Sequence, residues 1–188
     1  MARPRSEDKR SAILSAAARV IATQGLGAPT AAIAKAAGVS NGSLFTYFAT
    51  KTDLFNQLYL QLKGEMSAVA FGDVPAAGDV REPLQALWTQ WLHWAAASPE
   101  KRRALAQLSV SDELTEATRQ MGHQAMAGIA GLLERSRQNG ALSRAPLAFV
   151  VGLMNALAET TVDFMIQDPA QADEQCLVAF EALWRMVN

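Results

Sequence analysis

The chain has 188 residues, of which 50% are hydrophobic and 19% charged, and its formal net charge is −1, which allows one or two compact units with a sizeable core. Its single cysteine, Cys176 in the run CLVAF, excludes an internal disulfide and is expected to be a small buried residue rather than a nucleophile. The start MARPRSEDKR lacks the apolar core of an export signal. The best apolar stretch, Leu147 to Ala158, is well short of the ~20 residues that cross a bilayer. A cytoplasmic protein with no membrane contact is therefore expected.

A helix-turn-helix pattern stands near the N-terminus, after a long first helix predicted from about Glu7 to Gln24 and stopped by Gly25. Thr30 is placed to cap the next helix, and Gly38 supplies the left-handed residue that ends it. The apolar side of this helix is formed by Ile33, Ala34 and Ala37.

A second short helix follows almost at once, and Ser40 can cap it. Three apolar residues are predicted to form its buried side: Leu44, Phe45 and Phe48. Four polar residues remain to reach outward: Asn41, Ser43, Thr46 and Tyr47. In a helix-turn-helix motif the second helix lies in the major groove, with its N-terminal turns nearest the base edges. The pattern indicates a DNA-binding head, and an ordinary helical hairpin is the alternative.

Helices are predicted along the remainder of the chain as well. Thr50 precedes a long helix that continues to about Phe71, and the breaker-rich segment GDVPAAGDV, residues 72–80, predicts a loop or linker. Pro83 opens the next helix, with one apolar face formed by Leu84, Leu87, Trp88, Trp91, Leu92 and Ala95, and with Trp94 at its edge. Ser98 and Pro99 start another helix.

Three further helices complete the expected fold. Ser111, with Asp112 and Glu113, is predicted to cap one that ends near Gly140, and helices over residues 146–166 and 171–187 follow. We therefore expect an all-α protein of about nine helices. Residues 1–50 would form a three-helix DNA-binding domain, and residues 51–188 would form a larger helical domain for ligand binding and dimerisation.

The last two predicted helices favour a homodimer, because the first of them is apolar nearly all round. One stripe is Leu147, Val150, Val151, Met154, Leu157 and Ala158, and the other is Phe149, Leu153, Ala156, Thr160 and Phe164. The final helix has a similar face, formed by Cys176, Phe180, Leu183, Trp184 and Val187. Two copies could pair as a four-helix bundle with Phe149, Leu153, Phe164, Phe180, Leu183 and Trp184 in the interface, the alternative being a fully intramolecular core.

Charge is distributed unevenly along the chain. Residues 1–51 contain seven Lys or Arg against two acidic residues, a net charge of +5, whereas the remainder contains ten basic and sixteen acidic residues, a net charge of −6. This asymmetry would direct the N-terminal end toward DNA phosphates. Arg3 and Arg5 lie ahead of the first helix in an arm that could reach the minor groove, or that could simply be disordered.

The first 60 residues resemble the TetR family of bacterial repressors, on the order and spacing of the first helix, Gly25, the pair Ile33 and Ala34, and AGVSNGSLFTYFATKTDLF at residues 37–55. The resemblance implies phosphate contacts from Thr30, Tyr47 and Lys51, and contacts to bases or adjoining backbone from Asn41, Gly42, Ser43 and Thr46. The family often has a charged or long polar residue just after the capping Thr, where this chain has Ala31 and Ala32. Base readout from the first helix of the motif is therefore not carried over.

The resemblance also implies a small-molecule inducer that binds in the body. Candidate apolar contacts are Met66, Trp88, Trp91, Trp94, Met121 and Met126, with His93, His123 or Gln124 as polar contacts, although core packing explains such residues equally well. The inducer is expected to be small and apolar or aromatic. No cofactor and no metal are expected.

An enzyme is not expected, because the two histidines, His93 and His123, lie thirty residues apart without a nearby acidic or cysteine partner in the sequence. The phosphate-binding patterns GxxxxGK and GxGxxG are absent. The sequence predicts a sequence-specific transcriptional repressor that binds operator DNA as a homodimer and is released by an inducer. The alternative is a helical dimeric interaction protein without specific DNA binding.

Overall fold

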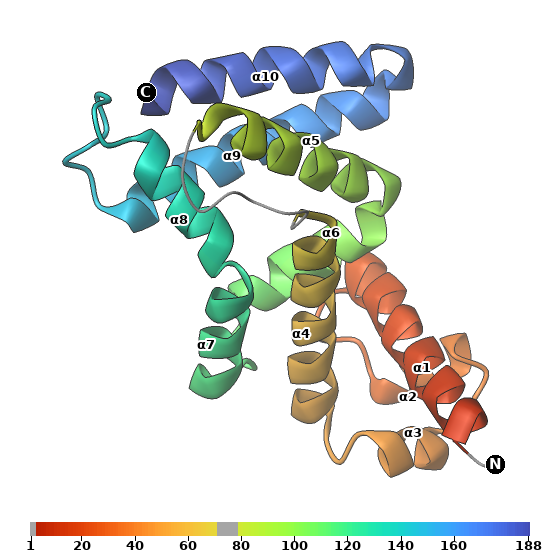
Figure 1. Ribbon diagram of the computed structural model, residues 1–188. Helices are drawn as coiled ribbons and strands as arrows, with labels where there is room; N and C mark the ends of the chain where they lie inside the picture. The colour runs from red at the N-terminus through yellow and green to blue at the C-terminus, as the bar shows by residue number, and fades with distance from the viewer. Residues whose placement is uncertain (1–2, 71–78) are drawn as a thin grey trace. The chain divides into compact units, whose positions relative to one another are not determined.

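The computed structural model describes residues 3–70 and 79–188, with the side chains of residues 6–68 and 79–188. All regular structure in these residues is helical, as predicted (Figure 1). The elements are α1 (Arg3–Gln24), α2 (Thr30–Ala36), α3 (Asn41–Tyr47), α4 (Lys51–Ala70), α5 (Arg81–Ala97), α6 (Pro99–Ser109), α7 (Glu116–Ala125), α8 (Ala127–Ser136), α9 (Leu147–Gln167), the short 3-10 helix η1 (Pro169–Gln171) and α10 (Ala172–Val187).

The chain divides into two compact units. Unit 1 comprises Met1–Gly64 and Ser98–His123, and unit 2 comprises Glu65–Ala97 and Gln124–Asn188. This division differs from the expected boundary after residue 50, because the first part of α4 and all of α6 pack with the N-terminal helices. Whether residues 1–50 and 51–188 divide the functions stays a prediction.

Unit 1 is formed around α1, which packs on α2 and α6, while α2 packs on α3 (Figure 1). Fully buried side chains from successive helices meet there, among them Ile13, Leu14, Ile21, Ile33, Leu44, Phe48, Leu54 and Phe55. Two glycines end helices in the left-handed conformation, as predicted: Gly25 has a φ of 78° and Gly38 a φ of 68°. The Gln107 amide donates a 3.2 Å hydrogen bond to the Ile21 carbonyl and so fixes α6 against the end of α1.

A buried amide ties α4 to the turn before α7 in unit 1. The Asn56 Nδ2 donates to the Thr52 carbonyl at 2.7 Å and to the Glu113 carbonyl at 2.9 Å, and its Oδ1 accepts from the Thr115 backbone N–H at 2.9 Å. The Thr52 hydroxyl also contacts the Glu113 carboxylate at 2.7 Å. Because Asn56 satisfies both its donor and its acceptor in these contacts, the turn is held at one position along α4.

Unit 2 surrounds Trp88 of α5, which is fully buried. Its indole N–H donates a 3.1 Å hydrogen bond to the Cys176 carbonyl of α10. The α5 face predicted from the sequence is buried at Leu84, Leu87, Trp88, Leu92 and Ala95, and Trp91 is partly buried against it. Helices α9 and α10 run side by side, and both pack on α5 (Figure 1). Burial of a large aromatic with its N–H satisfied explains why α5 is the central helix of this unit.

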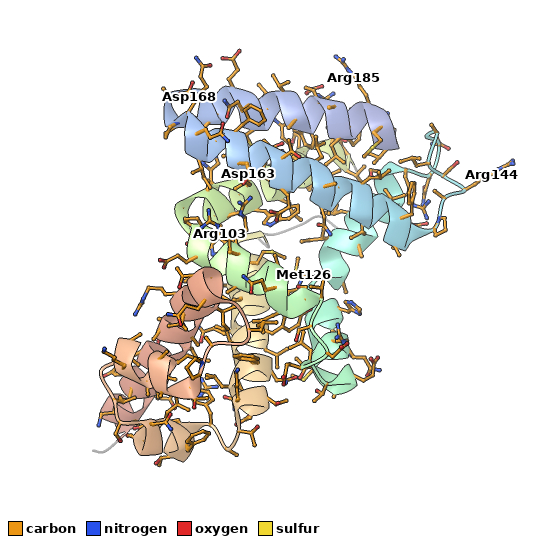
Figure 2. All side chains as sticks on the ribbon, turned by 180° about the vertical axis from the view of Figure 1, so that it is seen from behind. Arg103, Met126, Arg144, Asp163, Asp168 and Arg185 are labelled. Carbon is orange, nitrogen blue, oxygen red and sulfur yellow. The ribbon has the colours of Figure 1, made fainter. Side chains whose placement is uncertain are left out.

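The long helix expected after residue 111 is divided in two. Its first part, α7, begins only at Glu116, where the Thr115 hydroxyl accepts from the Thr118 N–H at 3.2 Å, while Ser111 caps only the preceding turn, accepting from the Glu113 N–H at 3.0 Å. Met126 lies at the break between α7 and α8 (Figure 2). The described residues therefore contain ten α-helices instead of nine. Most of the loop predicted over residues 72–80 lies outside the described residues.

Helix α9 continues beyond the predicted apolar stretch of residues 147–158. Over its 21 residues it is long and apolar enough to cross a membrane by length and composition alone, with a mean hydropathy of 1.4. Core helices of soluble proteins meet the same criterion. Only 33% of the hydrophobic window is buried within the chain.

Candidate nucleic-acid interface

The short helix α3 is fixed at its start, in its middle and just after its end. The Ser40 hydroxyl accepts a 3.0 Å hydrogen bond from the Ser43 N–H, as the predicted cap requires. Leu44 and Phe48 are fully buried and anchor one side of the helix in unit 1. This leaves the opposite side of a seven-residue helix in solvent.

A hydrogen-bond network positions the turn between α3 and α4. The Thr50 hydroxyl accepts from the Asp53 N–H at 2.9 Å, and the Asp53 carboxylate accepts in return from the Ala49 N–H at 3.0 Å. The same carboxylate accepts from the Gln57 amide at 2.7 Å, and Arg10 of α1 donates to Gln57. The Arg10 guanidinium also lies 5.6 Å from the centre of the Phe48 ring. These contacts couple α1, α4 and the end of α3, so they determine how α3 is presented.

Most of the residues predicted to contact DNA lie on α3, while Thr30 lies on α2 and Lys51 on α4. Asn41, Gly42 and Thr46 are exposed, and Ser43, Tyr47, Lys51 and Thr30 are half-buried. The Thr46 hydroxyl donates to the Gly42 carbonyl at 3.4 Å, and the Lys51 Nζ lies 5.3 Å from the centre of the Phe55 ring. All seven residues belong to unit 1. The structure thus brings together polar and cationic groups suited to phosphates and base edges.

Three sequence expectations about this region need correction. Thr30 is the first residue of α2 and not its cap, since Pro29 occupies the cap position without a side-chain hydrogen bond. Arg3 and Arg5 lie within α1 rather than ahead of it, and their side chains are outside the described residues. Phe45, expected on the buried side of α3, is 42% exposed. Its neighbours Leu44 and Phe48 already fill that side.

Sequence reasoning missed the roles of Asp53, Gln57 and Arg10. A local signal for Asp53 was present, because Thr50 followed three residues later by an acidic residue is close to a capping box. No local signal existed for Arg10 and Gln57, whose contact joins residues 47 positions apart.

Residues 13–58 match the family model described as bacterial regulatory proteins, tetR family. The matched segment contains α2, α3 and most of α1, together with the start of α4. Over this segment the chain is similar to the TetR family. Its fold is that of a DNA-binding transcription regulator, and α3 occupies the place of the recognition helix in the helix-turn-helix.

Solved TetR-family structures resemble the chain over nearly its whole length. A TetR family transcription regulator from Shewanella sp. PV-4 is 28% identical, with 94% of this chain and 96% of that chain covered and a TM-score of 0.79. One from Marinobacter aquaeolei VT8 has 24% identity, 98% coverage of both chains and a TM-score of 0.86. The TetR-like regulator LfrR from Mycobacterium smegmatis, solved in complex with proflavine, has 19% identity, coverage of 94% and 95%, and a TM-score of 0.66.

The residues predicted to contact an inducer are divided between the two units. Trp88 is core, and Trp91 meets it edge-on with ring centres 5.9 Å apart. Trp94 and Met126 are partly buried against the same core, and Met66 is buried in unit 2. Met121 is 54% exposed in unit 1. A surface depression of about 330 Å³ on α5 is lined by none of the predicted apolar contacts, but by Glu82, Gln85, Ala86, Thr89 and Gln90.

The polar residues predicted to contact an inducer can also be located, and so can the two histidines considered for catalysis. His123 and Gln124 are exposed. The His93 Nε2 lies 3.2 Å from the Asp173 carboxylate, an acidic partner that the sequence did not reveal because it lies far along the chain. Within the described ranges, no group of three or more His, Cys, Asp or Glu residues could hold a metal ion. The His93 and Asp173 side chains are both exposed, which suits a surface pair rather than a catalytic dyad.

Burial shifts the pKa of three side chains. It raises the pKa of the Cys176 thiol, an effect reduced by the Thr89 hydroxyl and increased by Asp173, so the cysteine is a buried thiol, as predicted. Burial raises the pKa of the Tyr59 phenol, which the Arg119 guanidinium partly offsets. It lowers the pKa of the Lys63 ammonium, whose Nζ lies 5.7 Å from the centre of the Tyr59 ring. Desolvation is the dominant cause in each case.

The residues predicted for a dimer interface fall into two groups. Phe149 and Phe164 of α9 are 56% and 55% exposed, and Leu153 is half-buried. Phe180 and Leu183 of α10 are fully buried in the core of unit 2, so their side chains are not available to a partner. Trp184 is half-buried and stacks on Phe180 with ring centres 6.4 Å apart. The exposed apolar residues of α10 are instead Leu177 and Val178, 50% and 63% exposed.

Proposed function

We propose that this protein is a homodimeric repressor that binds a palindromic operator and is released from it by a small apolar or aromatic molecule. The observation that carries the proposal is the exposed side of α3, where Asn41, Gly42 and Thr46 stand beside the half-buried Tyr47 and Lys51. The net charge of +5 over residues 1–51 supports approach of this face to phosphates. Binding to the chromosome would require a cytoplasmic protein.

A duplex-binding titration at two salt concentrations tests this function directly. We expect a preferred sequence, selected from random duplexes, to bind more tightly than unrelated duplexes. We also expect all affinities to fall steeply as salt rises, because phosphate contacts release counterions. The alternative, a helical dimer that binds another protein and not DNA, predicts no enriched sequence and no steep dependence on salt.

The dimer would form through α9 and α10. Exposed or half-exposed apolar side chains on these adjacent helices support it, namely Phe149, Leu153, Phe164, Leu177 and Val178. Exposed apolar patches of this kind on soluble proteins mark sites of association. A two-fold dimer would present two copies of α3 to half-sites about 34–36 Å apart. Sedimentation of the wild-type protein at micromolar concentration should show the dimer, and a clean monomer would contradict it.

The inducer would bind in the helical body and lower operator affinity. Support comes from the aromatic and methionine-rich surroundings of Trp91, Trp94 and Met126, and from the structural likeness to a regulator solved with proflavine, a planar aromatic ligand. Release requires that the ligand prefer the conformation that does not bind DNA, and couplings of about 1–3 kcal/mol are typical. A shift of α4, which begins at Lys51, would tilt α3 relative to its half-site.

A thermal-shift screen of aromatic and apolar compounds, followed by operator release, tests the inducer. Compounds that raise the melting temperature should also weaken operator binding roughly 5- to 150-fold at saturation. Ligands that stabilise the protein yet leave operator affinity unchanged would show that the body does not bind an inducer.

A further inference from the structure

Phe45 is an exposed aromatic side chain on the helix that presents the DNA-facing residues. Among the large apolar side chains described in residues 6–64, it is the exposed one, at 42% of its accessible area. The residues on either side of it in the helical register, Leu44 and Phe48, are fully buried. Folding of unit 1 therefore does not use the outer part of the Phe45 ring.

The exposed side of α3 combines polar residues with one aromatic ring. Residues 41, 42, 45 and 46 are all exposed and share one side of the helix, because positions three and four residues apart are neighbours on a helical surface. An added Cβ at Gly42 would meet nothing within 4 Å, so the surface beside Phe45 is open. The ring thus stands between a polar amide at Asn41 and a hydroxyl at Thr46, with room for a flat partner to approach.

The chemistry of the major groove offers one apolar feature to such a ring, which is the C5-methyl group of thymine. We propose that Phe45 reads thymine by packing against this methyl group when α3 lies in the groove. The inference rests on the proposed operator binding and adds to it a base that the polar residues do not recognise. Because Phe45 lies about one helical turn from Asn41, the thymine is expected near the base that faces Asn41.

Removal of single methyl groups from the operator tests the contact. The probe is a duplex selected by the wild-type protein from a random library, in which each thymine is replaced in turn by deoxyuridine. Base pairing is kept and only the methyl group is lost. We expect one position in each half-site to weaken wild-type binding about fourfold, the effect of exposing one buried methyl group.

The same scan with protein variants assigns the effect to the residue. With Phe45→Ala the dependence on that methyl group should disappear, and with Phe45→Leu it should be reduced. Val110→Ala is the matched control, because Val110 is 85% exposed in the same unit but lies outside the helix-turn-helix, and it should keep the full fourfold effect. Circular dichroism should show that Phe45→Ala stays folded, and thermal melting measures what the buried part of the ring contributes to stability.

Several outcomes would overturn the inference. If the selected duplex is bound specifically but no deoxyuridine position matters, or if Phe45→Ala keeps the full dependence, Phe45 does not read a thymine methyl. If the variant instead loses self-association with no change in DNA binding, the ring covers a protein surface. If no duplex is enriched at all, operator binding itself is wrong, and the inference falls with it.

Discussion

Helix α3 and the α9–α10 pair both leave apolar side chains in solvent, but in different amounts and surroundings. On α3 the exposed apolar residue is Phe45, set among Asn41, Gly42 and Thr46. On α9 and α10 four large apolar residues are at least half exposed: Phe149, Phe164, Leu177 and Val178. A lone ring in a polar setting suits a mixed partner such as a base edge, whereas a larger apolar face needs an apolar partner. The extent of uncovered apolar surface thus distinguishes the two kinds of partner.

The contrast between buried and exposed apolar side chains can be tested inside unit 2, where Phe180 is buried in the core and Phe164 is exposed. Phe180→Ala should lower the free energy of unfolding by about 3–5 kcal/mol, because it empties space in a filled core. Phe164→Ala is the matched control, since its ring is 55% exposed and its loss leaves no internal cavity. Urea unfolding at low protein concentration measures both, and equal losses would show that the two rings do not differ in burial.

Phe164→Asp should leave the fold intact and weaken the dimer roughly 100-fold, because an unpaired carboxylate would be buried in an apolar interface. Operator binding should be lost with it, although the head is unchanged. Trp184→Asp is a less specific test, because Trp184 is half-buried and the Arg81 guanidinium lies 5.5 Å from its ring centre. Sedimentation measures the dimer, and circular dichroism shows whether the variant is folded. If the dimer of Phe164→Asp is as stable as that of the wild type, α9 is not part of the interface.

Unit 1 should respond to a single methyl group at Gly122. A Cβ there would lie 2.6 Å from the Tyr59 Cε1 atom, so Gly122→Ala should destabilise the protein by about 1–3 kcal/mol. Gly131→Ala is the control, because a Cβ at that exposed position of α8 meets nothing within 4 Å, and it should stabilise by about 0.5–1 kcal/mol. Thermal unfolding reads out both changes, and a stabilising Gly122→Ala would mean that Tyr59 moves freely.

On α3 itself, Asn41→Ala should change the preferred operator sequence, because an amide can pair with an adenine edge for about 1–3 kcal/mol of discrimination. Lys51→Ala or Tyr47→Phe should instead weaken binding to all duplexes similarly, as expected of phosphate contacts. Selection of bound oligonucleotides with each variant separates these effects. An unchanged preference for Asn41→Ala would exclude it as a base reader.

The smallest effect is expected from the turn that follows α3. Asp53→Ala removes the carboxylate that accepts from the Ala49 N–H and the Gln57 amide, and should cost about 0.5–2 kcal/mol of stability. Operator affinity should fall further than stability alone explains, because the end of α3 loses its support. Asp53→Asn, which keeps an acceptor oxygen, should recover part of the loss in both measurements.

Part of the local backbone chemistry was predictable from the sequence, although the caps expected at Thr30 and Ser111 were wrong. The left-handed glycines Gly25 and Gly38 and the caps Ser40 and Thr50 depend on a few neighbouring residues, and the structure confirms all four. The exposure of Phe45 was missed because periodicity does not say which of the adjacent apolar residues Leu44 and Phe45 is buried in a seven-residue helix.

The outward face of α10 was mispredicted for a related reason. Phe180 and Leu183 face α5 and α9 within the chain, while Leu177 and Val178 face outward, and only the packing of three helices separated in sequence decides this. The partner of His93 and the contacts of Asn56 are equally non-local, since they join residues more than fifty positions apart.

The buried Asn56 has a practical consequence for building hybrid regulators. Its hydrogen bonds to the segment at residues 113–115, together with the packing of α6 on α1, mean that unit 1 is built from two separate segments of the chain. A chimera joined once, at Thr50, would remove α6 from α1. It would also replace the buried residues Leu54, Phe55 and Leu58 with those of an unrelated sequence. Moving unit 1 onto another helical body therefore requires three junctions, near residues 64, 97 and 123, so that both of its segments are transferred together.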